Sequence, residues 1–275
     1  MIIDSHQHFW KYDPVRDAWI NESMSVIRRD FYPTDLEPIL KANNIDGCVA
    51  VQADQSEDET RFLLDFANQY DFIKGVVGWV DLLDKGVEGR LEYFADDKLL
   101  KGIRHVVQAE PDPEFMLRKD FQEGIGRLAK FGLTYDILVY PHQLAAAIEL
   151  TRKFPNQKFV LDHIAKPQVS KGMDSLWRRN IEALAKASNV YCKLSGMVTE
   201  TKDFLWAENQ FYPFMEVVLE SFGTDRVLYG SDWPVCLVAG TYEDVLTIVS
   251  NFIQQLSPTE QKNIMGLNAV RFYEL

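Results

Sequence analysis

Short stretches of apolar and β-branched residues recur along the chain, with helix-like segments between them. They lie at residues 2–8, 46–53, 73–80, 101–107, 134–140, 158–164, 190–195 and 227–232. Several are almost continuously apolar, as expected of strands that are buried on both faces. Their spacing averages about 32 residues, the size of one strand–helix unit. Because strands that alternate with helices pair in parallel, the pattern predicts one α/β barrel that occupies residues 1–275 as a single domain.

The segments between the strands carry helix start and stop signals. Thr34–Glu37 and Ser56–Glu59 each match a capping box, in which the hydroxyl and the glutamate satisfy exposed backbone N–H groups. Ser257–Glu260 is expected to open a final helix. Gly132 and Gly223 follow apolar stripes at helical spacing and are placed to end their helices. We therefore expect these helices to pack their apolar faces against the barrel.

The segment 9–33 is long for a connection between a strand and a helix. It contains Trp10, Trp19, Arg28 and Arg29, and its aromatic content argues against disorder. Loops of this length are usually functional or disordered. We expect it to form a flap over the mouth of the barrel; the alternative is a loop that folds down onto the barrel's side.

The chain contains only five histidines, and three of them end predicted strands together with one aspartate. His6 and His8 close the first strand, His163 closes the sixth and Asp232 closes the eighth. The carboxyl ends of parallel barrel strands meet at one mouth, and side chains two residues apart on a strand project to the same side. Three imidazoles and a carboxylate match a catalytic metal site. The pattern therefore predicts an enzyme.

Composition and charge argue against several classes of binding partner and location. The net charge of −12 argues against nucleic acid and anionic membranes. No apolar run approaches the roughly 18 residues of a membrane span, and the first residues do not match a secretory signal. The three cysteines share no metal-ligand spacing, which favours reduced thiols in a cytoplasmic protein.

Several motifs give the chain a family resemblance across nearly its whole length. They are Ile3–Trp10, Lys101–Arg104, Leu161–Pro167, Gly230–Pro234 and Asn268–Tyr273. In these motifs the chain resembles the amidohydrolase superfamily, in the "amidohydrolase 2" branch that includes sugar-lactone hydrolases and 2-pyrone-4,6-dicarboxylate lactonase. The resemblance implies a distorted (β/α)8 TIM barrel and hydrolysis of a cyclic ester or a related bond.

The resemblance also implies a set of site residues. The core would be His6, His8, His163 and Asp232, with Arg104 and Tyr140 as substrate contacts. Binuclear members of the superfamily bridge two metals with a carboxylated lysine or a glutamate from strand 4. Here that strand has its lysine, Lys101, at the wrong end, so a two-metal centre is not expected. The alternatives are one divalent metal ion, with zinc as the expected metal, and catalysis without a metal.

Other residues near the strand ends have two interpretations each. Trp10 and Trp233 flank site residues and suit the apolar face of a sugar ring, but wall packing explains them equally well. His142 follows the fifth strand and is either a site contact or a helix-start residue on the rim. Arg104 either contacts substrate or forms a structural ion pair with Asp4 or Asp136, because an unpaired buried charge is costly.

Three further residues at these strand ends are expected to act outside the chemistry. His105 neighbours Arg104 on its strand and so should face outward. Asp162 is expected to be buried as hydrogen-bonded support, and Lys166 is assigned no chemistry.

The favoured function is a hydrolase that opens a sugar-acid lactone of the fucono- or rhamnono-type. Asp232 would deprotonate a water that attacks the ring ester carbonyl, and a protonated group, with Asp232 itself as the candidate, would assist the leaving ring oxygen. The alternative is a lyase that decarboxylates an aromatic or muconate-like acid on the same barrel. A binding protein on a dead barrel is disfavoured because the histidines and the aspartate are all retained. Barrels of this kind often pair, so a homodimer stays an open alternative.

Overall fold

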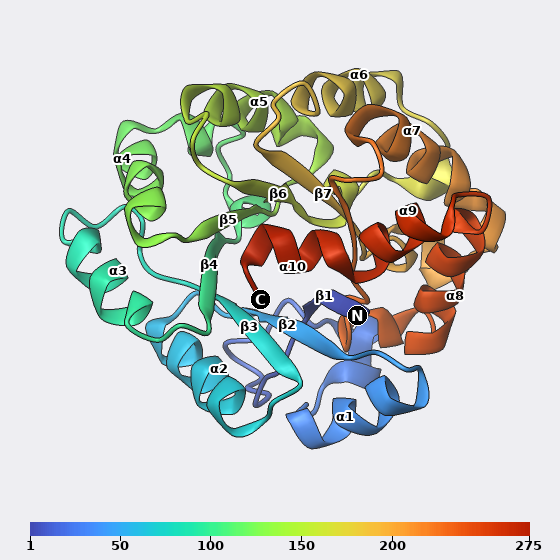
Figure 1. Ribbon diagram of the computed structural model, residues 1–275, viewed down its shortest axis with the longest axis horizontal. Coiled ribbons are helices and arrows are strands. Elements are labelled where there is room, and N and C mark those ends of the chain that lie inside the picture. The colour runs from blue at the N-terminus through green and yellow to red at the C-terminus, as the bar shows by residue number, and fades with distance from the viewer.

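A computed structural model describes residues 1–275 and confirms the predicted barrel (Figure 1). Its eight strands lie side by side in chain order, and neighbouring strands pair in parallel. The strands are β1 Ile3–Gln7, β2 Gly47–Val51, β3 Ile73–Gly78, β4 Leu100–His105, β5 Thr134–Ile137, β6 Phe159–Leu161, β7 Val190–Leu194 and β8 Val227–Tyr229. A parallel bridge between Gln7 and Trp233 brings the chain after β8 beside β1. All eight predicted strands are therefore present, each slightly shorter than its sequence pattern.

Helices surround the strands, and the last one closes one end of the barrel (Figure 1). They are α1 Pro33–Ala42, α2 Glu57–Gln69, α3 Val87–Ala95, α4 Lys119–Leu128, α5 Leu144–Lys153, α6 Ser175–Leu184, α7 Tyr212–Phe222, α8 Tyr242–Ile253, α9 Pro258–Lys262 and α10 Asn268–Tyr273. Ala269, Phe272 and Tyr273 of α10 pack in one buried cluster with Ile3 and Leu228 of the strands. The end that α10 covers is the one where the strands begin, so the mouth at their carboxyl ends is left for the site.

Two of the three predicted helix starts, those at Ser56 and Ser257, are confirmed. Ser56 and Ser257 each accept a hydrogen bond from the backbone N–H three residues on. The prediction at Thr34 is wrong, because α1 begins at Pro33 with Tyr32 as its N-cap, two residues before Thr34. There the carboxylate of Asp35 accepts from the N–H just before the proline, which has no N–H of its own and suits the first helical position.

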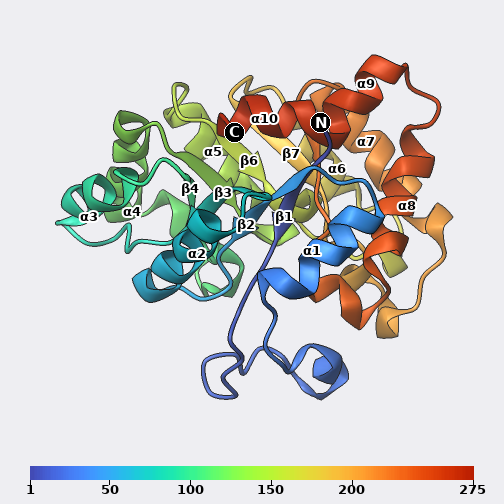
Figure 2. The same cartoon turned by 60° about the horizontal axis from the view of Figure 1, so that its bottom comes forward.

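The segment 9–33 lies at the opposite end of the barrel from α10 (Figure 2). Its two ends are tied together by paired backbone hydrogen bonds between Trp10 and Phe31. Arg28 pairs with Glu22 within the segment, so it does not reach into the barrel. No helix of the structure combines the length and the apolar character needed to cross a membrane, and all three cysteines are buried as free thiols.

Candidate active site

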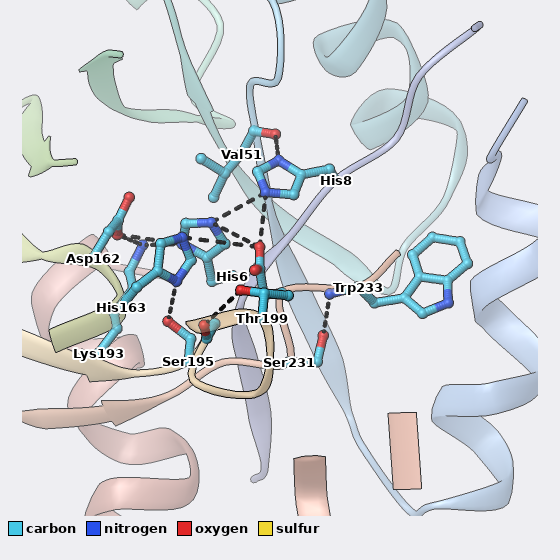
Figure 3. A network of polar contacts seen from close by, with 12 residues as sticks. His6, His8, Val51, Asp162, His163, Lys193, Ser195, Thr199, Ser231 and Trp233 are labelled. Atoms are coloured by element: carbon cyan, nitrogen blue, oxygen red, sulfur yellow. Dashed lines mark hydrogen bonds and ion pairs between the residues drawn. The ribbon is translucent and has the colours of Figure 1, made fainter. Parts of the chain in front are cut away.

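The imidazoles of His6, His8 and His163 converge inside the barrel mouth (Figure 3), and the Asp232 carboxylate lies beside them. His6 Nε2 lies 3.2 Å from His8 Nε2, and His8 Nε2 lies 3.3 Å from Asp232 Oδ1. The same Asp232 oxygen is 3.8 Å from His6 Nε2 and 3.9 Å from His163 Nε2. The structure thus brings together the four side chains that the strand-end pattern singled out, and the ligand atoms of His6, His8 and Asp232 lie close enough to share one metal ion.

The ends of β1 and β8 are joined through their backbones. His8 N–H donates to the carbonyl of Trp233 at 2.7 Å, and Asp232 N–H donates to the carbonyl of His6 at 2.8 Å. Asp4 supports the same junction from β1 by accepting bonds from the N–H and hydroxyl of Ser231. These contacts place Asp232 beside His6 and His8, although more than two hundred residues separate them.

His163 is held by an uncommon backbone conformation after β6. Four consecutive non-glycine residues, His163 to Lys166, have φ between 49° and 60°. A left-handed turn of this kind costs about 1–2 kcal/mol per residue in L-amino acids. The indole N–H of buried Trp177 donates to the carbonyl of Ile164 at 2.8 Å and anchors the turn. Gly196 also makes room, because a Cβ there would overlap the His163 ring.

Hydrogen bonds fix the orientation of two of the imidazoles. His8 Nδ1 lies 2.7 Å from the backbone carbonyl of Val51 (Figure 3). A carbonyl oxygen only accepts, so His8 carries its proton on Nδ1 and turns the lone pair of Nε2 toward the site. His163 Nδ1 lies 2.9 Å from Ser195 Oγ. Such outer partners orient the rings that they bind.

A fully buried lysine lies beneath the cluster. Lys193 Nζ on β7 is 2.6 Å from Asp136, 3.0 Å from Asp162 and 3.1 Å from His6 Nδ1. Sequence reasoning missed this residue. The signal was a lysine within the buried strand at 190–195, where a charge needs partners.

Arg104 points into the barrel, as one of its two interpretations requires, and is almost fully buried. Its guanidinium lies 3.1 Å from Asp162 Oδ2 and 3.3 Å from His6 Nε2. The expectation of an ion pair with Asp4 or Asp136 is wrong, because Asp162 is the partner. His105 faces outward as expected and stacks on Phe115.

Burial and neighbouring charges shift the pKa values of the site residues in the directions that suit a general base. Burial lowers the pKa of His163 to about 4 against the opposing pull of nearby carboxylates, and it lowers that of His6 well below the usual range. Burial raises the pKa of Asp232, but its proximity to His163 and His8 outweighs this and holds the pKa below its usual range. At neutral pH the site therefore presents His6 and His163 as neutral imidazoles beside an ionised Asp232 carboxylate.

A cavity of about 240 Å³ opens above the cluster. Its polar lining includes His8, Arg104, Gln108, His163, Lys166 and Asp232. Trp10 and Trp19 contribute from the segment 9–33, which thus forms part of the cavity wall. Trp233 does not line the cavity. It is buried behind the wall, with its ring 5.2 Å from that of Phe31.

Tyr140 and His142 lie together in a neighbouring cavity. Their rings stack at 6.2 Å, and both line a space of about 760 Å³ with Gln168, Asp174 and Glu200. Lys166 lines this outer cavity as well as the inner one. The structure thus does not bring His142 to the imidazole cluster.

The donor set fits a single metal ion. Zinc takes nitrogen and oxygen ligands at about 2.0–2.2 Å in a tetrahedron, which places neighbouring ligand atoms roughly 3.3 Å apart. His6, His8 and Asp232 offer three such atoms at 3.2–3.8 Å from each other. A three-ligand set leaves a fourth position for water or substrate, as in catalytic sites.

The chain is similar to proteins of known family and to two lactonases. A model of the amidohydrolase family, Amidohydro_2, matches residues 3–275. An L-fucono-1,5-lactonase from Burkholderia ambifaria is 34% identical over 99% of this chain and 95% of its own length. The corresponding lactonase from Burkholderia multivorans is 36% identical over 99% of this chain and 96% of its own.

A crystal structure extends the comparison to three dimensions. It is an amidohydrolase from Burkholderia multivorans with bound zinc, 36% identical, that superposes with a TM-score of 0.96 over 100% of this chain and 99% of the other.

Proposed function

Since the chain belongs to the amidohydrolase family, we propose that it hydrolyses the ring ester of a sugar-acid lactone of the fucono- or rhamnono-type. The observation that carries the proposal is the convergence of Asp232 with three imidazoles on a small cavity. The two L-fucono-1,5-lactonases that match almost the whole chain support it. The cavity of about 240 Å³ is smaller than the roughly 300–1,000 Å³ of drug-sized ligand sites and suits a single sugar ring.

The polar lining of the cavity suits a polyol. Gln108 lines it and keeps its side-chain oxygen buried without a hydrogen-bond partner. A sugar hydroxyl would satisfy this oxygen, since a buried polar atom left unpaired is costly. The faces of Trp10 and Trp19 suit the apolar face of the ring. Arg104 is held by Asp162 and offers its guanidinium at the cavity floor.

In the mechanism, Asp232 acts as the general base. Its ionised carboxylate takes a proton from a water, which attacks the lactone carbonyl carbon. Arg104 lies beside the carbonyl oxygen, and its guanidinium stabilises the negative charge that develops on that oxygen. General-base catalysis contributes typically 10²–10⁴-fold to the rate.

We further propose that His6, His8 and Asp232, with His163 alongside, hold one zinc ion. When bound, the ion would polarise the lactone carbonyl as a Lewis acid. The orientation of His8 suits this role, because its Nδ1 bonds the Val51 carbonyl and its Nε2 faces the site. The bound zinc of the Burkholderia multivorans amidohydrolase supports the choice of metal.

The proposal is tested by a hydrolysis screen with a pH indicator. A panel of aldonolactones, with pyrone and muconolactone controls, is offered to zinc-loaded and chelator-treated enzyme. Acid release should appear on one stereochemical series. Asp232→Asn should lose about 10²–10⁴-fold in kcat, whereas Asp65→Asn, an exposed carboxylate on α2, should not. Silence across the panel, or near-full turnover by folded Asp232→Asn, would refute the proposal.

A further inference from the structure

Lys166 stands at the boundary between the two cavities. It is the last residue of the left-handed turn that begins with His163, and it lines both the inner and the outer cavity. Its side chain is 15% exposed, so most of it is enclosed by protein. Backbone strain of this kind persists where surrounding structure holds it and clusters at active sites. One strained turn thus delivers both an imidazole of the cluster and an ammonium to the same cavity.

The ammonium of Lys166 has one ion-pair partner and keeps donor hydrogens free for a ligand. Its Nζ lies 3.5 Å from Glu200 Oε1 and 5.9 Å from the centre of the Tyr140 ring. An ammonium has three donor hydrogens, and one ion pair leaves the others for a ligand. The other cations near the cluster are committed elsewhere. Lys193 is completely buried between two carboxylates, and Arg104 is held by Asp162 and Gln52.

Opening a lactone requires a proton at the ring oxygen. When the tetrahedral adduct collapses, the electron pair of the carbon–oxygen bond passes to that oxygen. An alkoxide is a poor leaving group, since its conjugate acid resembles water, with a pKa of about 15.7. Asp232 has meanwhile taken the proton of the attacking water. A second group able to supply a proton would let both transfers proceed in one turnover.

We propose that Lys166 is a catalytic residue that donates a proton from Nζ to the leaving ring oxygen, an inference that rests on the proposed lactonase function. The carbon–oxygen bond breaks, the ring oxygen becomes a hydroxyl and Lys166 is left as a neutral amine. The amine regains a proton from solvent in the outer cavity, while Asp232 releases to solvent the proton it took from water. The products are a hydroxy acid anion and one proton, so atoms and charge balance. Glu200 positions the ammonium between turnovers.

A change of leaving group separates this role from simple binding. In a thiolactone of the same sugar, sulfur replaces the ring oxygen, and a thiolate leaves without a proton because a thiol has a pKa of about 8.5. The experiment measures kcat on the lactone and the thiolactone for the wild type, Lys166→Met and Lys166→Arg. Arginine keeps the positive charge but is effectively always protonated. Lys171→Met, an exposed lysine of the outer cavity, is the matched control.

Both Lys166 variants should lose about 10²–10⁴-fold on the lactone and less than roughly fivefold on the thiolactone. Lys171→Met should match the wild type on both. Equal losses on the two substrates, or rescue of lactone hydrolysis by Lys166→Arg, would overturn the proposal and assign Lys166 to binding. If Lys166→Met fails to fold, the loss of Lys166→Arg on the lactone compared with its loss on the thiolactone decides alone. A wild type that is inactive on every lactone would instead refute the proposed function.

Discussion

Replacement of Lys193 by methionine should strongly destabilise the barrel. The side chain is completely buried, with Nζ 2.6 Å from Asp136 and 3.0 Å from Asp162. Methionine fills similar space but supplies no charge and no donor. Both carboxylates would then face each other inside the protein, with only Arg104 left as a cation at 3.1 Å from Asp162.

The magnitude follows from the state of the two carboxylates. Removal of one partner from a buried ion pair typically costs 3–5 kcal/mol, about a third of a typical unfolding free energy of 5–15 kcal/mol. Asp136 offers partial relief. Burial, against the opposing charge of Lys193, raises its pKa to about 6, and loss of the lysine raises it further. Protonation removes the uncompensated charge, so the cost should be smaller at about pH 5 than at about pH 8.

Urea unfolding at these two pH values measures the effect. We expect a loss of about 3–5 kcal/mol at the higher pH and a partial return of stability in Lys193→Met combined with Asp136→Asn. Lys101→Met is the control, because that lysine is half-buried at the other end of the barrel and bonds only a backbone carbonyl. A loss below about 1 kcal/mol, as for a surface ion pair, would show that the ion pairs of Lys193 with Asp136 and Asp162 do not stabilise the barrel.

Three further outcomes follow from the structure. Trp177→Phe removes the donor to the carbonyl of Ile164 and should cost about 1–3 kcal/mol and lower kcat, whereas unchanged thermal unfolding would argue against the anchor. Burial raises the pKa of Glu59 from 4.5 to about 8, so wild-type stability should fall as pH rises through that range, and urea titration of Glu59→Gln should lack this component. His8→Gln should weaken zinc binding in calorimetry by roughly tenfold or more; equal affinity would remove His8 from the ligand set.

The sequence was sufficient to predict the barrel and the convergence of four side chains at its mouth. His6, His8, His163 and Asp232 each stand at the end of an apolar strand, and parallel barrel strands bring such ends to one mouth whatever their separation along the chain. The prediction needed only the period of the elements and the position of each residue at the end of its apolar segment. No knowledge of packing was required.

The residues around that core could not be placed in the same way. Tyr140 and His142 follow β5 closely but line the neighbouring cavity, and Trp233 turns behind the wall. Which way a side chain faces just beyond a strand depends on the local turn, and the sequence gives no clear sign of that turn. The left-handed run from His163 to Lys166 is the clearest case, because nothing in residues with ordinary side chains signals a positive φ.

The costly features of this molecule are concentrated at the catalytic end. The strained turn that ends at Lys166 and the buried charges around Lys193 all lie within reach of the imidazole cluster. Selection for stability alone would not retain them, since left-handed turns of ordinary residues are strained and replacement of a whole buried ion-pair network by apolar residues is often neutral or stabilising. A large apolar core elsewhere can offset their cost. Variants that relax the left-handed turn, or that replace the whole charged network with apolar residues, should therefore gain stability and lose turnover.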